Sequence, residues 1–190
     1  MLLDAPSTVG IVPRPHRIQA PETLYHVTGN ATDRWHLFVD DVDRAHFISI
    51  VATVVKKYEW MFYGLVLMGT HDHLLFRTKH ANIAAGMQEL NSRYATDFNR
   101  RHTRPGHLFR ARYGARVVEG SGHLLSCLRY MARNPVEAGL CDAPLDWPWS
   151  TYPRLVGAGE AWPFVAADEV LGLFARDRAT AIALFRDFVE

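Results

Sequence analysis

Two apolar segments separated by only two residues constrain the fold more than any other feature of the chain. Residues 61–68 (MFYGLVLM) form a mostly apolar run, Gly69 and Thr70 follow, and residues 71–78 (HDHLLFRT) form a second run. A two-residue link between runs of this kind is typical of an antiparallel pair of strands. The sequence therefore predicts a β-hairpin over residues 61–78.

Helices and single strands are expected on both sides of this hairpin. Apolar residues at helical spacing predict helices over residues 42–58 and 81–101, and strand character marks residues 24–29 and 115–119. A further amphipathic helix is expected over residues 122–133, ending before Asn134 and Pro135, because proline disfavours helical geometry in the residue that precedes it. The order predicts an α+β fold, a ferredoxin-like βαββαβ antiparallel sheet with helices on one face.

The chain is expected to divide into three parts. Residues 1–21 are punctuated by proline and predict an extended N-terminal leader, residues 22–152 hold the main domain, and residues 153–190 predict a C-terminal helical extension with a helix near 168–189. With 48% hydrophobic and 12% aromatic residues, the 190-residue chain is excluded from the disordered class. No apolar run approaches the length of a membrane span and no secretory signal is visible, and two cysteines suit a reducing compartment, so a cytoplasmic protein is expected.

Positive charge is concentrated in one part of the chain. The net charge is only +1, yet residues 91–116 hold seven arginines and one aspartate. Such a stretch is typical of a surface that binds nucleic acid, although a solvated helix face would give the same pattern.

Two pairs of residues have the spacing of a catalytic site. His71 and His73 are two apart on a predicted strand and therefore share one face of the sheet. Tyr130 and Asn134 are four apart on a predicted helix and share one helical face. Each pair alone is better explained by ordinary structural residues. His26, on the first strand, is interpreted as a structural sheet histidine, with a neighbour of the site as the alternative.

Taken together, the two pairs suggest a reaction at phosphorus. A divalent cation held by two imidazoles and a side-chain amide oxygen would polarise a phosphodiester, and a tyrosine hydroxyl beside it could attack. Tyrosine has an ordinary pKa of about 10, so it needs a cation to stabilise the phenolate. The product would be a phosphotyrosine ester that conserves the bond for a later rejoining step.

Several motifs resemble one known family. They are YHVTG at 25–29, LVLMGTHDHLLFRT at 65–78, LNSRYATDFNRRH at 90–102, GHLFRARY at 106–113, LRYMARNPVEAGL at 128–140 and WPWSTY at 147–152. This pattern resembles the single-tyrosine transposases of the His-hydrophobic-His superfamily, and most closely the repeat-associated tyrosine transposases. The resemblance covers residues 24–152 and implies that residues 22–152 form a transposase-like nuclease domain.

The resemblance implies a role for each of the four candidate residues. Tyr130 matches the nucleophile, His71 and His73 match the metal ligands, and Asn134 lies where a third, amide-type ligand is expected, with Mg²⁺ or Mn²⁺ as the cofactor. The implied activity is cleavage and rejoining of single-stranded DNA beside a hairpin or palindrome through a 5′-phosphotyrosine intermediate. A homodimer and a nucleoid-associated location are also implied.

The basic stretch would then contact the DNA. The arginines assigned to this role from charge alone are Arg93, Arg100, Arg101, Arg104, Arg110 and Arg112.

The chain departs from the family pattern in ways that leave alternatives open. The residue between the histidines is normally hydrophobic and here is Asp72, and Ala132 stands where the family commonly has a histidine. Asp72 should face the helix-covered side of the sheet. Three explanations remain: the carboxyl is exposed at the strand end, it is paired with an arginine, or the site has diverged from the functional family pattern. An active transesterase, a catalytically impaired module that binds DNA hairpins, and a metal-dependent hydrolase that uses water therefore remain as hypotheses.

Overall fold

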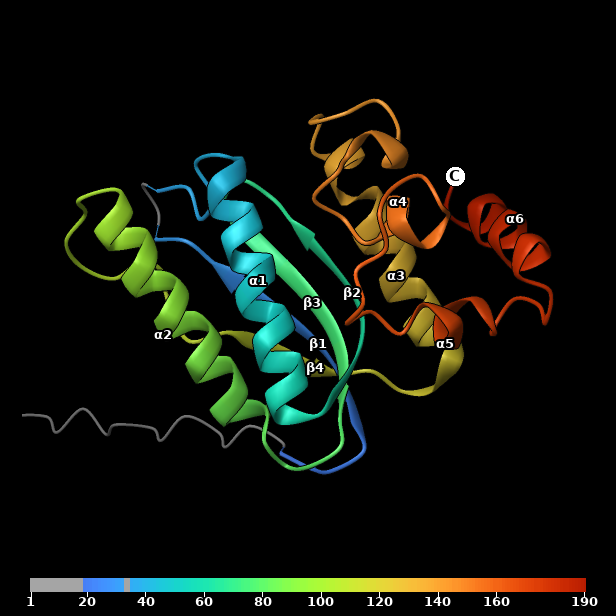
Figure 1. Cartoon of the computed structure of the whole chain (residues 1–190), viewed down its shortest axis with the longest axis horizontal. Coiled ribbons are helices and arrows are strands. Elements are labelled where there is room, and N and C mark those ends of the chain that lie inside the picture. The colour runs from blue at the N-terminus through green and yellow to red at the C-terminus, as the bar shows by residue number, and fades with distance from the viewer. Residues whose placement is uncertain (1–18, 33–34) are drawn as a thin grey trace, which may run out of the picture.

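The computed structural model describes residues 19–32 and 35–190 and shows a four-stranded antiparallel sheet with helices on both faces (Figure 1). The order of the strands across the sheet is β2-β3-β1-β4, which is the ferredoxin-like order expected from the sequence. Most of the expected leader, residues 1–18, lies outside the described residues. The elements of the βαββαβ unit are β1 (Thr23–Asn30), α1 (Asp41–Tyr58), β2 (Trp60–Leu67), β3 (His71–Thr78), α2 (Ile83–Arg101) and β4 (Gly114–Val117).

The predicted hairpin is confirmed and forms one side of the sheet, with β2 at the edge and β3 inside. β2 pairs with β3, and the Met68 amide donates to the His71 carbonyl across the two-residue turn at 2.9 Å. β1 pairs with the other side of β3, with Thr28 opposite His73. The three strands fix the register of β3, so its side chains alternate strictly between the two faces of the sheet.

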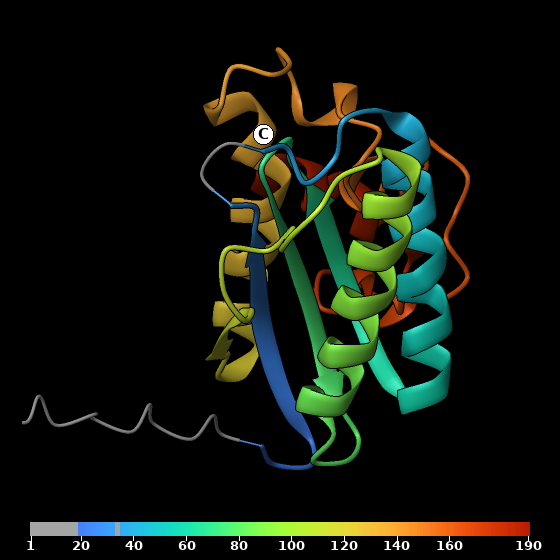
Figure 2. The ribbon, with the colours of Figure 1, turned by 90° about the vertical axis from the view of Figure 1, so that its left-hand side faces the viewer.

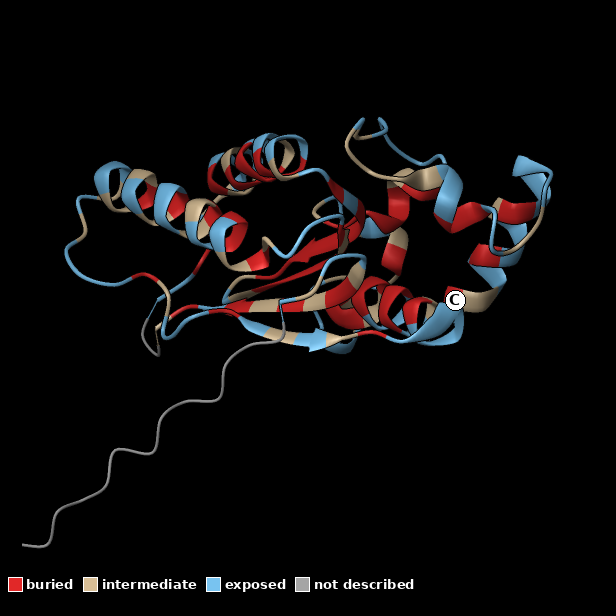
Figure 3. Ribbon diagram, turned by 90° about the horizontal axis from the view of Figure 1, so that it is seen from below, coloured by how far each residue is buried: buried red, intermediate tan, exposed pale blue. Residues whose placement is uncertain are grey.

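The two helices of the βαββαβ unit lie on one face of the sheet, as expected. Asp40 caps the start of α1, where its carboxylate accepts from the Asp43 amide. Glu59 caps the end of the helix in a left-handed conformation that leads directly into β2. Apolar residues of α1 and α2 share one buried cluster with alternate residues of the strands, among them Tyr25, Val27 and Phe76. Figure 3 shows this arrangement as buried inner faces and exposed outer faces on both helices.

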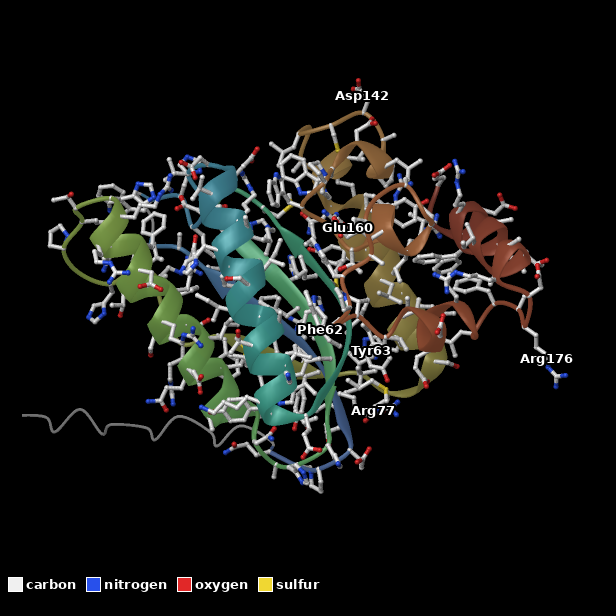
Figure 4. The ribbon with its side chains drawn as sticks, viewed as in Figure 1. Phe62, Tyr63, Arg77, Asp142, Glu160 and Arg176 are labelled. Atoms are coloured by element: carbon white, nitrogen blue, oxygen red, sulfur yellow. The ribbon has the colours of Figure 1, made fainter. Side chains whose placement is uncertain are left out.

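A third helix, α3 (Gly120–Glu137), follows the unit and packs on the opposite face, so helices cover both faces rather than one. Figure 2 shows the sheet between α1 and α2 on one side and α3 on the other. The alternation on β2 serves both layers, because Phe62 packs with α1 and α2 whereas its neighbour Tyr63 packs with α3 (Figure 4). Since α3 lies outside the βαββαβ unit, the rule for that unit does not set its face.

The expected end of the third helix at Asn134 is wrong. α3 continues through Pro135 to Glu137, and the Ala138 amide donates to the Asn134 carbonyl at 3.0 Å. Proline removes one amide donor, but it lies in the last turn, where a missing hydrogen bond costs little because the helix ends two residues later. As a result, Asn134 is held inside the helix rather than at its end.

The C-terminal extension packs on α3 and on the outer edge of β2. The expected helix near 168–189 is divided in two, because Asp177 caps a new helix by accepting from the Thr180 amide. A further segment pairs with β2, where the Leu67 amide donates to the Trp149 carbonyl. The elements that follow α3 are η1 (Pro144–Asp146), α4 (Tyr152–Leu155), α5 (Ala167–Leu171) and α6 (Arg178–Val189). Among the described residues, no helix is both long and apolar enough to cross a membrane.

Candidate active site

The two predicted histidines lie on the face of the sheet that α3 covers. His71 and His73 are separated by one residue on β3, and their ring centroids are 5.2 Å apart. His73 is buried with 6% of its surface exposed, whereas His71 is partly exposed at the strand end. The structure therefore places one histidine inside the molecule and the other at the rim.

α3 brings the predicted tyrosine and asparagine to these histidines. The ring centroid of Tyr130 lies 5.4 Å from that of His73, and the Asn134 side-chain nitrogen lies 3.4 Å from His73 Nε2. Tyr130 keeps 46% of its surface exposed, so its hydroxyl can meet a ligand from solvent. The four residues that sequence analysis singled out are thus assembled from β3 and α3.

His26 on β1 is also part of this arrangement, although sequence analysis interpreted it as a structural sheet histidine. His26 Nε2 lies 2.9 Å from His73 Nδ1, and its ring centroid is 6.3 Å from that of Tyr130. When the proton of the hydrogen bond between the two histidines is on His73 Nδ1, His73 Nε2 is unprotonated and its lone pair is directed at Asn134. The hydrogen bond between the histidines therefore fixes which nitrogen of His73 faces the site.

Burial keeps the imidazoles of this cluster neutral. It lowers the pKa of His73 to about 3, with further contributions from His26 and His71, and it lowers the pKa of His71 below its ordinary value. The pKa of His26 is lowered by burial and then by Arg116 and His123. A neutral imidazole is the form that binds a cation, because a protonated ring has no free lone pair.

The donor set is compatible with a divalent cation. His73 Nε2 faces the Asn134 amide, whose oxygen and nitrogen exchange places when the group is turned over. Two nitrogen donors and one oxygen donor leave further coordination positions for substrate oxygens and water. Within residues 19–32 and 35–190, no group of three or more His, Cys, Asp or Glu side chains is placed to hold a metal.

The cluster opens into a cleft of about 630 Å³ between α3 and the edge of the sheet. Its lining adds residues that sequence analysis did not assign to the site, above all Arg116 on β4 and His123 on α3. Arg116 lies directly opposite His26 in the pairing of β1 with β4, and it is exposed. Strand alternation places Arg116 on one of the two faces of the sheet. Only the pairing of β4 with β1 shows that this is the face on which His26 lies.

Asp72 is buried on the opposite face, so exposure at the strand end is excluded. It retains 2% of its surface, and its Oδ1 makes no hydrogen bond within the described part of the chain, so an arginine partner is absent there as well. Burial raises the pKa of this carboxyl to about 7. The carboxyl occupies the space beside Gly29, its neighbour across β1, where a Cβ atom would collide with it.

Two of the six predicted DNA-binding arginines stabilise the fold. Arg101 forms ion pairs with Asp40, at 2.6 Å, and with the buried Asp43, and so ties the end of α2 to the start of α1. Arg104 stacks on Trp35, with its guanidinium carbon 4.5 Å from the ring centroid, and donates to the Thr32 hydroxyl. These contacts hold both side chains in place without a nucleic acid.

The other four predicted arginines are distributed over two surfaces. Arg93 and Arg100 form ion pairs of 3.7 and 2.8 Å with acids on their own helix, on the outer surface of α2. Arg110 and Arg112 are exposed on the segment between α2 and β4. None of the six lines the cleft that contains Tyr130.

The ferredoxin-like sheet, the paired histidines and the facing tyrosine together define the class of single-tyrosine transposases. The sequence matches the family described as "Transposase IS200 like" over residues 20–134, which is more than half of the chain. The chain belongs to this IS200-like transposase family, as the sequence motifs predicted. Its members are DNA-processing enzymes.

One solved structure confirms the fold. A tyrosine transposase associated with REP elements, solved bound to a REP hairpin, superimposes with a TM-score of 0.66 at 16% identity, covering 80% of this chain and 90% of that one. A candidate transposase from Deinococcus radiodurans R1 gives a TM-score of 0.43 at 18% identity over 64% of this chain and 96% of that one. The tRNA(His) guanylyltransferase of Saccharomyces cerevisiae gives 0.46 at 10% identity over 94% and 82%. No curated protein matches the sequence.

Proposed function

We propose that this transposase-family protein cleaves and rejoins single-stranded DNA beside a hairpin, with Tyr130 as the nucleophile. The observation that carries the proposal is the exposed Tyr130 ring 5.4 Å from the buried His73, whose Nε2 faces Asn134. A hairpin substrate is supported by the similarity in fold to a transposase that was solved with a REP hairpin. The expected product is a DNA end joined through its 5′-phosphate to Tyr130.

The cleavage step exchanges one ester for another. Tyr130 Oη attacks the phosphorus, its proton leaves, the bond from phosphorus to the 3′-oxygen breaks, and that oxygen takes up a proton to become a 3′-hydroxyl. Attack by a 3′-hydroxyl on the phosphotyrosine reverses the step and rejoins the strand. Because one phosphodiester is replaced by another, no external energy source is needed.

Each residue of the cluster has a part in this step. His71, His73 and Asn134 would hold Mg²⁺ or Mn²⁺, which, when bound, stabilises the developing negative charge at the phosphate and at the tyrosine oxygen. His26 orients His73 through the 2.9 Å hydrogen bond. Arg116, exposed in the same cleft, would bind a phosphate of the strand near the cleavage site.

A covalent-trapping assay tests the proposal. The protein is mixed with a pool of single-stranded oligonucleotides that form hairpins with varied flanks, in Mn²⁺ or in EDTA, and analysed on a denaturing gel beside Tyr130→Phe. A shifted band that needs the metal and disappears in the phenylalanine variant is expected. Tyr152→Phe is the matched control, because this second tyrosine hydroxyl is bonded to Glu190, away from the cleft.

A second candidate function rests on Asp72. Asp72 is a buried carboxyl whose Oδ1 has no hydrogen-bond partner among the described residues, and it lies directly between the two histidines in sequence, which would suit a binding module that has lost catalysis. That module would bind hairpins in EDTA and give no adduct with any metal. Cleavage without an adduct, retained in Tyr130→Phe, would instead show a hydrolase that uses water.

A further inference from the structure

A second and larger groove lies on the other side of the sheet edge from the Tyr130 cleft. It has a volume of about 910 Å³ and runs between α2 and the segment 106–113 that leads to β4. In Figure 2 this segment leaves the upper end of α2 and descends along the open edge of the sheet. The volume is at the upper end of the range for ligand clefts, about 300–1,000 Å³.

The wall that α2 contributes is polar but uncharged. The outer surface of this helix has a charged side and an uncharged side. On the charged side, Arg93 pairs with Glu89 and Arg100 pairs with Asp97. The side that faces the groove carries only small, amide and hydroxyl side chains beside the core residue Met87. Its hydrogen-bonding members are Gln88, Asn91, Ser92, Thr96 and Asn99.

Two amides of this wall are available to a ligand. Asn99 is committed to the fold, because it donates to the Gly106 carbonyl and accepts from Arg104, which anchors the start of the opposite wall. Gln88 and Asn91 lie one turn apart on the helix, and in the part of the chain that the structure describes neither side chain makes a hydrogen bond. Asparagine and glutamine amides each present a donor and an acceptor that match a base edge.

The opposite wall is positively charged. Arg110 and Arg112 line it together with His107, and no acidic residue is among the described residues that line the groove. Phe109 contributes an aromatic ring at the same wall. Neutral hydrogen-bonding groups on one side and arginines on the other suit an anionic chain that carries bases, with its phosphates on the loop side and its base edges toward α2.

The groove is continuous with the candidate active site through the chain itself. Tyr113 is the last residue that lines the groove, and Gly114, Ala115 and Arg116 line the Tyr130 cleft. β4 is the edge strand on this side of the sheet and is only four residues long. A single strand that leaves the cleft past Arg116 therefore needs to cross only this short strand to reach the groove.

We propose that the groove between α2 and residues 106–113 binds the single-stranded DNA that adjoins the cleavage site, with Gln88 and Asn91 reading its bases. This inference rests on the proposed function and specifies how that function selects its substrate. Unpaired bases fit the arrangement because their hydrogen-bonding edges are exposed, whereas those of a duplex are reached only through its grooves.

Selection from a pool of hairpins with varied stems and randomised single-stranded flanks tests the assignment. The DNA bound by the unaltered protein is sequenced and compared with that bound by the double variant Gln88→Ala/Asn91→Ala. Gln19→Ala is the matched control, because it removes an exposed amide outside the groove. Affinities are then measured by fluorescence anisotropy for one selected hairpin with its flank and for the same hairpin without it.

The unaltered protein and Gln19→Ala should enrich the same bases in a flank. The double variant should lose that preference and bind the flanked hairpin about 100-fold more weakly, since each of the two bidentate amide contacts to a base is worth about tenfold. Its affinity for the hairpin without a flank should be unchanged, which also shows that the variant is folded. An unchanged base preference in the double variant overturns the groove assignment alone, whereas failure of the unaltered protein to bind any hairpin overturns the proposed function as well.

Discussion

Replacement of Asp72 by asparagine is expected to stabilise the protein, and the effect should depend on pH. The carboxyl retains 2% of its surface and its Oδ1 has no hydrogen-bond partner in the described residues. Burial raises its pKa from the ordinary 3.8 to about 7. At about 1.4 kcal/mol for each pKa unit, this difference corresponds to about 4 kcal/mol lost when the buried group is ionised.

The direction of the pH effect on stability follows from which state, folded or unfolded, binds the Asp72 proton more tightly. Between pH 3.8 and about 7 the folded protein holds the proton on Asp72 while the unfolded chain releases it. The stability contributed by this group is therefore full below pH 3.8, falls as the pH rises through this interval, and is lowest above pH 7. Asparagine has nearly the same shape and no charge, so Asp72→Asn should match the unaltered protein near pH 4 and exceed it by about 4 kcal/mol at pH 8.

Urea denaturation at both pH values measures this difference. The unaltered protein and the variant are compared, with Asp187→Asn on the exposed surface of α6 as the control for loss of a carboxylate. The control should shift stability by less than about 0.5 kcal/mol at either pH. Equal stability of Asp72→Asn and the unaltered protein at pH 8, or the same gain at both pH values, would refute the claim that a buried ionised carboxyl strains this sheet.

Two further predictions concern residues that contact the site or were assigned to DNA. His26→Ala should weaken Mn²⁺ binding about 10- to 100-fold by calorimetry, because His73 loses the partner that fixes its orientation; an unchanged affinity would remove His26 from the site. Arg101→Ala should lower the free energy of unfolding in urea by about 1–3 kcal/mol, because the buried Asp43 loses a charged partner. Unaltered stability together with weakened DNA binding would restore to Arg101 the role predicted from charge.

The sequence predicted the central part of the fold well because the hydrophobic pattern there is unambiguous. The strand expected over residues 71–78 is the observed β3. The two-residue turn before it allows only antiparallel pairing with the preceding strand, which is β2. Pro135 misled the prediction for α3, because local preference sets a boundary less firmly than the packing of Leu128 and Met131 against the sheet. The position of α3 on the opposite face depends on tertiary packing, which no local pattern contains.

The four residues of the candidate site could be predicted because strand and helix periods place each pair on one face and because the motifs around them resemble a known family. Arg116 could not, since its place beside Tyr130 depends on the pairing of β4 with β1, two segments about 90 residues apart in the chain. Charge alone also does not show that Arg101 already pairs with Asp40 and Asp43, and the assignment of the six arginines to DNA stays a prediction. The homodimer, the cation and the three-part division of the chain stay predictions.

Peptide mapping of the covalent adduct tests the central claim most directly. The trapped complex would be digested with a protease and a nuclease, and the residue that carries the nucleotide identified by mass spectrometry. The account predicts a nucleotide joined through its 5′-phosphate to Tyr130. The modified peptide should extend from before Tyr130 to beyond Asn134 when the protease cuts the chain outside this segment. A nucleotide on any other residue, or joined through a 3′-phosphate, would contradict the assignment of Tyr130 as the nucleophile.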